Sequence, residues 1–152
     1  MVAVEILGVS EGLNHHVVLL RHEDRVLPIV VGVPEAQAIH IGLTKEKPGR
    51  PMTHDLLCNV LAGLNGTLES VTIYKLENET FFAHLNVEQR SSDGEIEQIL
   101  RVDSRPSDGI AVAVRVGCPV YVAEEVMDQA AQDMAILPSD DDSDEDSDDS
   151  DD

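Results

Sequence analysis

The chain contains no tryptophan, two tyrosines, two phenylalanines and two cysteines in 152 residues. Two cysteines cannot build the disulfide framework of a small secreted domain, so we expect a reducing, cytoplasmic compartment. No apolar run approaches the roughly 20 residues of a membrane-spanning helix, and the chain opens on strand-like sequence rather than on a signal peptide. So few aromatic rings also supply little material for stacking on unpaired bases. The composition therefore excludes a disulfide-rich secreted protein and a membrane protein.

Basic residues are scarce as well: ten Lys and Arg stand against thirty Asp and Glu, for a net charge of −20. The last fourteen residues, 139–152, contain only Ser, Asp and Glu, and ten of them are acidic. Such a segment has no apolar surface to offset the entropy cost of ordering, so we expect a disordered acidic tail. Residues 1–138 have the length of one domain with a substantial core. This acidic body excludes a highly basic nucleic-acid binder.

Hydrophobic periodicity in the body predicts an α+β domain. We expect about seven short strands in a mixed, largely antiparallel sheet and about four helices. Proline and an acidic residue in the first turn mark two of the helix starts, at Pro34 and Pro106. The expected strands cover residues 2–9, 16–21, 25–31, 67–76, 81–87, 96–102 and 119–122, and the expected helices cover residues 34–43, 53–64, 106–117 and 124–134.

Three stretches place charged residues where a loop enters a helix, namely residues 27–36, 50–55 and 102–108. Free backbone N–H groups converge at a helix start, and a neighbouring Arg can help them hold a phosphate. A carboxylate beside that phosphate can bind a divalent cation or position a water molecule. These are the parts that hydrolysis of a phosphodiester bond requires.

The residues of these stretches can be given roles. We expect the catalytic residues to converge on one cleft, with His54 as the acid or base and Arg105 on the phosphate. A metal, Mg²⁺ or Mn²⁺, would be held by carboxylates, and no organic cofactor is expected. The catalytic candidates are His54, Asp55, Arg105 and Asp108; the metal candidates are Glu35, Asp103 and Asp108; the nucleic-acid-binding candidates are Lys45, Lys47, Arg50 and Arg105.

Each of these residues also has a structural interpretation. Thr53 and Asp55 are ordinary helix-start residues, and so is Asp108. Arg105 can form an ion pair with Asp103, Asp108 or Glu35. His54 and Cys58 lie four residues apart, which suits zinc, but no second pair at ligand spacing is evident and ordinary packing is favoured.

The same stretches resemble the bifunctional nuclease domain family. The motifs that carry this resemblance are LPIVVGVPEAQAI from Leu27, RPMTHDLL from Arg50, DSRPSDGIA from Asp103 and PVYVAEEV from Pro119, and the similarity covers about residues 2–129. The resemblance implies a small α+β domain with DNase and RNase activity. Gly109 stands where many members carry Ala, and Val30-Val31 where a bulkier aromatic is common. Many members continue into a short helical UvrB/UvrC-type module, which the acidic tail replaces here.

The charge of the motifs and the charge of the whole chain point to different functions. The motifs indicate a metal-assisted nuclease that hydrolyses DNA or RNA. The acidic body favours the alternative, a non-catalytic binding or scaffold domain that regulates transcription or repair complexes. DNA or RNA is the expected partner, a homo-oligomer stays open, and no membrane is expected. For the tail, solubility and competition with nucleic acid as a phosphate mimic are both kept as hypotheses.

Overall fold

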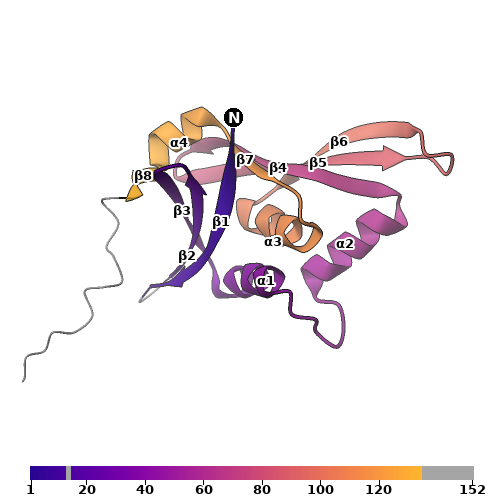
Figure 1. The fold of residues 1–152 in the computed structure, drawn as a ribbon, viewed down its shortest axis with the longest axis horizontal. Coiled ribbons are helices and arrows are strands. Elements are labelled where there is room, and N and C mark those ends of the chain that lie inside the picture. The colour runs from indigo at the N-terminus through magenta and orange to yellow at the C-terminus, as the bar shows by residue number, and fades with distance from the viewer. Residues whose placement is uncertain (13–14, 135–152) are drawn as a thin grey trace, which may run out of the picture.

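The computed structural model describes residues 1–12 and 15–134. Its elements follow the order that the sequence pattern predicts (Figure 1). In chain order they are β1 (Val2–Glu11), β2 (His16–His22), β3 (Arg25–Val31), α1 (Val33–Thr44), α2 (Thr53–Gly63), β4 (Gly66–Glu77), β5 (Thr80–Arg90), β6 (Ile96–Ser104), α3 (Pro106–Val116), β7 (Val120–Val122), α4 (Glu124–Ala130) and β8 (Gln132–Asp133).

The strands form one eight-stranded sheet in the order β6-β5-β4-β7-β1-β2-β3-β8. All neighbours are antiparallel except β4 and β7, which run parallel and pair Val71 with Val120. The short strand β7 also pairs with the first residues of β1, so it joins two antiparallel meanders into one sheet. The predicted α+β class with four helices and a largely antiparallel sheet is confirmed.

The C-terminal end of the described chain differs from the prediction. We expected one helix over residues 124–134, but α4 ends at Ala130 because Ala131 adopts extended backbone (φ −72°, ψ 146°). The next two residues, Gln132 and Asp133, then pair with Val26 and Arg25 on β3. They form the eighth strand, which the sequence pattern did not reveal. The predicted acidic tail and its boundary at residue 138 lie outside the described residues.

Helix α3 packs on one face of β4 and β5, and Figure 1 shows α1 and α2 gathered on the same side. Close packing of α3 requires a small residue at Gly109, where an added Cβ would lie 2.8 Å from Val71 Cγ1 on β4. The core between helices and sheet is aliphatic, with Ile73, Ile110 and Met127 fully buried. We call the face of the sheet on which α3 packs the inner face.

Helix α2 is the exception to this burial, because none of its residues is buried. Its apolar stripe includes Leu56, Leu57, Val60 and Leu64, which are 41–60% exposed. No helix among the described residues is long and apolar enough to cross a membrane.

A cluster at the start of three helices

The first turns of α1, α2 and α3 meet around one cleft of about 250 Å³. Glu35 lies in the first turn of α1, His54 in the first turn of α2 and Asp108 in the first turn of α3. Arg105 is the residue that precedes α3. We call Glu35, His54, Arg105 and Asp108 the helix-start cluster. Two of these helices have a proline in the first turn, Pro34 in α1 and Pro106 in α3, where its missing N–H group leaves no helix hydrogen bond unmade.

Asp108 is the centre of the cluster. Its Oδ1 lies 2.9 Å from His54 Nε2, although the two residues are 54 positions apart in the sequence. Its Oδ2 accepts a hydrogen bond of 2.9 Å from Arg105 Nε, and Arg105 Nη2 lies 3.3 Å from Oδ1. Arg105 Nη1 reaches Glu35 Oε1 at 3.3 Å. One carboxylate therefore bridges an imidazole and a guanidinium, and that guanidinium extends to a second carboxylate.

The electrostatics of the cluster keep Asp108 ionised. Partial burial acts to raise the pKa of Asp108, but the hydrogen bonds from Arg105 and His54 outweigh it and hold that pKa below its usual value. The same hydrogen bond with Asp108 raises the pKa of Arg105. The cluster therefore pairs the ionised Asp108 carboxylate with the Arg105 cation.

The His54 ring is oriented for proton transfer. Its side chain is 12% exposed and Nε2 faces an ionised carboxylate, so Nε2 carries the proton and donates it to Asp108. In the neutral ring the other nitrogen, Nδ1, has a free lone pair, and no hydrogen bond reaches it within residues 1–12 and 15–134. An imidazole held by a carboxylate in this way can accept a proton from a water molecule or a hydroxyl group.

Arg105 keeps part of its hydrogen-bonding capacity. A guanidinium has five N–H donors, and the contacts to Asp108 and Glu35 occupy three of them. The Arg105 side chain is 64% exposed, whereas Asp108 is 32% exposed and Glu35 is 22% exposed. The remaining N–H groups can therefore reach a phosphate oxygen from the solvent side.

Asp55 is adjacent to His54 in the sequence, but its carboxylate lies outside the cluster. Oδ2 accepts a hydrogen bond of 2.9 Å from the Met52 backbone N–H, and Oδ1 accepts one of 2.9 Å from Arg115 Nε. The backbone hydrogen bond from Met52 and then the contact with Arg115 lower the pKa of Asp55. Asp55 therefore caps the start of α2 and links α2 to α3, and its catalytic role stays a prediction.

Arg115 was not singled out by the sequence pattern, yet it connects all three helices of the cluster. Besides Asp55 on α2, its Nη1 donates to the carbonyl oxygens of Ala38 on α1 at 2.8 Å and Ala111 on α3 at 2.7 Å. The side chain is only 9% exposed. An arginine in the last turn of a helix is usually explained by the helix dipole alone. Its partners lie 60 and 77 residues away in sequence, so spacing could not reveal them.

The proposed metal residues do not gather in one place. Asp103 lies on β6 opposite His84, on the sheet face away from α3, whereas Glu35 and Asp108 both contact Arg105. Within the described residues no group of three or more His, Cys, Asp or Glu side chains could hold a metal ion. Dependence on Mg²⁺ or Mn²⁺ stays a prediction.

The proposed basic groove is divided as well. Arg105 belongs to the helix-start cluster, but Lys45 Nζ donates to the carbonyl oxygen of Val114 at the end of α3, at 2.8 Å. Lys45 and Lys47 line a separate hollow of about 220 Å³. Arg50 is exposed in the loop before α2. Their roles in nucleic-acid binding stay predictions.

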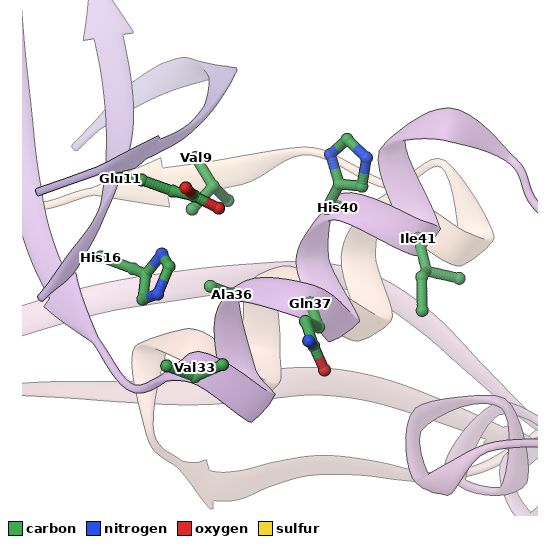
Figure 2. A pocket seen from close by; sticks show the side chains of 8 residues that line it. All are labelled: Val9, Glu11, His16, Val33, Ala36, Gln37, His40 and Ile41. Atoms are coloured by element: carbon green, nitrogen blue, oxygen red, sulfur yellow. The ribbon is translucent and has the colours of Figure 1, made fainter.

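A larger pocket of about 500 Å³ lies between the β1–β2 hairpin and α1 (Figure 2). Its polar side chains include Glu11, His16 and His40, and its floor is formed by apolar residues such as Val9 and Ala36. Glu11 and His16 are cross-strand partners on β1 and β2, whereas His40 on α1 lies apart from them in Figure 2. Among the described residues no hydrogen bond or ion pair joins these polar groups, in contrast to His54 and Asp108. The helix-start cluster is therefore the better candidate for chemistry.

A family model described as bifunctional nuclease domain matches residues 17–135. Two uncharacterised proteins from two strains of Mycobacterium tuberculosis are each 40% identical over 131 residues, which span 84% of this chain and 74% of theirs.

Two plant proteins are more distant relatives. Bifunctional nuclease 1 of Arabidopsis thaliana is 27% identical over 111 residues, which span 71% of this chain and 33% of that protein. Bifunctional nuclease 1 of Oryza sativa subsp. indica is 22% identical over 124 residues, which span 80% of this chain and 37% of that protein.

Proposed function

Because this chain belongs to the bifunctional nuclease domain family, we propose that it hydrolyses phosphodiester bonds of DNA or RNA at the helix-start cluster. The observation that carries the proposal is the 2.9 Å hydrogen bond between His54 and Asp108, which joins two helix starts far apart in the sequence beside an exposed arginine. The names of the plant relatives support the reaction class, and the cluster supports its location.

The proposed reaction needs a base, an anion-binding group and an acid. His54 Nδ1 takes a proton from water while the water oxygen forms a bond to phosphorus. Asp108 keeps the ring oriented and stabilises the imidazolium that results. The free N–H groups of Arg105 bind the phosphate oxygens as charge develops on them. The P–O ester bond then breaks, and the leaving oxygen takes the proton back from His54.

The charge of the cluster sets a condition on substrate binding. Two carboxylates and one guanidinium give a net charge of −1 when His54 is neutral, which repels a phosphodiester. Arg105 must therefore turn part of its guanidinium toward the substrate. Its contact with Glu35 is 3.3 Å long, compared with 2.9 Å for the shortest contact with Asp108, so Glu35 is the partner that gives way.

Initial cleavage rates test this proposal. Single-stranded RNA and DNA 12-mers with a fluorophore and a quencher are incubated with wild-type protein, with His54→Gln and with Asp108→Asn. Val116→Ala, an exposed apolar truncation at the end of α3, is the matched control purified in parallel. Loss of a positioned acid–base group lowers rates about 10²–10⁴-fold. The proposal fails if both cluster variants cleave as fast as Val116→Ala.

Metal dependence is tested in the same assay. Each protein is measured in EDTA and again after addition of Mg²⁺ or Mn²⁺, across a range of salt. Restoration of cleavage by either ion supports the predicted metal-assisted reaction. Equal rates in EDTA and in Mg²⁺ assign the reaction to His54, Asp108 and Arg105 alone.

A non-catalytic binding domain is the second proposal. It is favoured by the net charge of −20 and by the engagement of Arg105 with two carboxylates. Binding of nucleic acid without cleavage under every metal and salt condition would select it. We also propose a cytoplasmic location, which suits the two unpaired cysteines Cys58 and Cys118. A homo-oligomer is proposed on the exposed apolar stripe of α2.

A further inference from the structure

The sheet has a second face, which points away from α3. Strand register places Asp103, His84, Thr72 and Tyr121 in one row across β6, β5, β4 and β7. Their neighbours along the strands alternate to the inner face, where Val71 and Leu85 contact α3. We call the surface around this row, on β4 to β7, the outer face.

Aromatic rings gather on the outer face. The Tyr74 ring lies 4.9 Å from the His84 ring and 6.4 Å from the Phe82 ring, and the Tyr74 side chain is 39% exposed. A β-bulge between Ile73 and Lys75 turns two consecutive side chains to the same side, so Lys75 Nζ lies 4.8 Å above the Phe82 ring. The strand pairing thus creates a small aromatic surface with the Lys75 ammonium group above one of its rings.

This clustering is unusual for a chain with so few aromatic residues. The sequence has four Phe and Tyr residues, and the outer face holds Tyr74, Phe82 and Tyr121. The fourth, Phe81, packs against the aliphatic core. Rings that only served folding would lie with Phe81, since burial is the usual source of their stabilising effect.

Hydrogen-bonding groups lie beside the rings. Asn86 Nδ2 donates to Ser70 Oγ at 2.9 Å and to Thr72 Oγ1 at 3.0 Å, which leaves its side-chain oxygen available as an acceptor. Arg101 stands opposite Asn86 on β6. Partial burial, and then the charge of Arg101, lower the pKa of His84. His84 is therefore a neutral aromatic ring at physiological pH.

We propose that the outer face binds single-stranded nucleic acid by stacking unpaired bases on Tyr74, Phe82 and His84. That the ligand is a nucleic acid rests on the proposed function. The rings of the outer face indicate that this nucleic acid is single-stranded. A sheet surface with partly exposed rings can stack on splayed bases, whereas paired bases in a duplex expose only their edges. Lys75, which also forms an ion pair with Glu77, and Arg101 are the cations next to the rings, and Asp103 lies opposite His84 in the same row.

The helix-start cluster lies on the α3 side of the sheet, and it comes nearest to the outer face where β5 begins and β6 ends. Strand β6 ends at Ser104, and Arg105 follows directly. A hollow of about 270 Å³ is lined by Arg105 together with Thr80 and Phe81, the first residues of β5. Phe82 is the next residue along that strand. A strand bound on the rings would therefore have to pass around this edge of the sheet to reach Arg105.

The chain contains its own probe for this test. It has no tryptophan, and its two tyrosines, Tyr74 and Tyr121, both belong to the outer face. Intrinsic tyrosine emission is titrated with a 12-nucleotide deoxythymidine strand at low salt, in EDTA and in the Asp108→Asn background, so that the strand stays intact. A free tyrosine amide corrects for absorption by the oligonucleotide. The tyrosine emission of the full chain is expected to decrease on binding. In Tyr121→Phe the remaining emission comes from Tyr74, and it is expected to decrease as well.

Substitution of the rings gives the decisive comparison. Tyr74→Leu and Phe82→Leu are titrated against a fluorescein-labelled form of the same strand by anisotropy. Each is expected to bind about 5- to 150-fold more weakly, the range that corresponds to a stacked base. Val116→Ala, an exposed apolar truncation on α3, is the matched control with unchanged affinity. The matching dA·dT duplex is expected to bind at least about 10-fold more weakly than the single strand.

Two outcomes overturn the proposal: no binding by the full chain at low salt, or equal affinity of Tyr74→Leu, Phe82→Leu and Val116→Ala. Circular dichroism checks that the variants are folded. The result is independent of the cleavage assay. If binding depends on the rings but no cleavage occurs, the outer face is supported as the binding surface and the proposed hydrolysis is refuted. If cleavage occurs but affinity does not depend on the rings, the proposed hydrolysis is supported and the outer face is refuted as the binding surface.

Discussion

Replacing Arg115 with methionine is expected to destabilise the fold by about 2–4 kcal/mol. The substitution removes a charge-assisted hydrogen bond to Asp55, worth about 1.5–3 kcal/mol, and two bonds to the carbonyl oxygens of Ala38 and Ala111, each worth about 0.5–1.5 kcal/mol. Methionine keeps much of the aliphatic packing. It also removes Arg115 Nη2, which is buried without a hydrogen-bond partner among the described residues, and this gain offsets part of the loss.

Thermal unfolding followed by circular dichroism measures the effect. A domain of this size changes its melting temperature by about 3–5 °C per kcal/mol, so a decrease on the order of 10 °C is expected. Asp55→Asn and the double variant complete a double-mutant cycle. Groups in direct contact show coupling of about 0.5–3 kcal/mol. A melting temperature lowered by less than about 2 °C, or fully additive single effects, would refute the role of Arg115 as the connection between the three helices.

Three further predictions concern pH, thiol reactivity and the tail. The pKa values of Asp55 and Asp108 are lowered in the folded protein, so their contribution to stability is present above the unfolded pKa of about 3.9 and is lost as pH falls through the folded values; the melting temperature should decrease below about pH 4, less steeply in Asp55→Asn. Burial raises the pKa of Cys118 to about 11 and also raises that of Cys58, so the folded protein should react with a disulfide reagent at pH 8 about 100-fold more slowly than the unfolded protein. If residues 139–152 compete with nucleic acid, their deletion should tighten binding at low salt and leave it unchanged near 1 M, where the Debye length is about 3 Å; equal affinity at low salt would leave solubility as their role.

Local signals made much of the fold predictable. Proline and acidic residues mark where α1 and α3 begin, because they suit the free N–H groups and dipole of a first turn. The alternation of residues in β4 and β5 likewise marks strands with one buried face. The contact between Arg105 and Asp108 was among the predicted ion pairs, and it joins residues three apart on the same helix start.

Contacts between distant segments could not be predicted in the same way. The partner of Asp55 is Arg115, sixty residues away, and it draws the carboxylate out of the cleft in which we expected it. The contact of His54 with Asp108 depends on how α2 and α3 pack together. The sequence also suggested too few aromatic residues for a stacking surface, since only strand register brings Tyr74 and Phe82 onto one face.

The central claim is that His54 and Asp108 act as one catalytic unit in phosphodiester hydrolysis. The most direct test compares kcat/KM for wild type, His54→Gln, Asp108→Asn and the double variant on a fluorogenic single-stranded 12-mer. Groups that act as a unit are strongly non-additive. We predict that each single substitution lowers kcat/KM about 10²–10⁴-fold and that the double variant is no worse than the poorer single variant. Wild-type rates in either single variant, or effects that multiply in the double variant, would contradict the account.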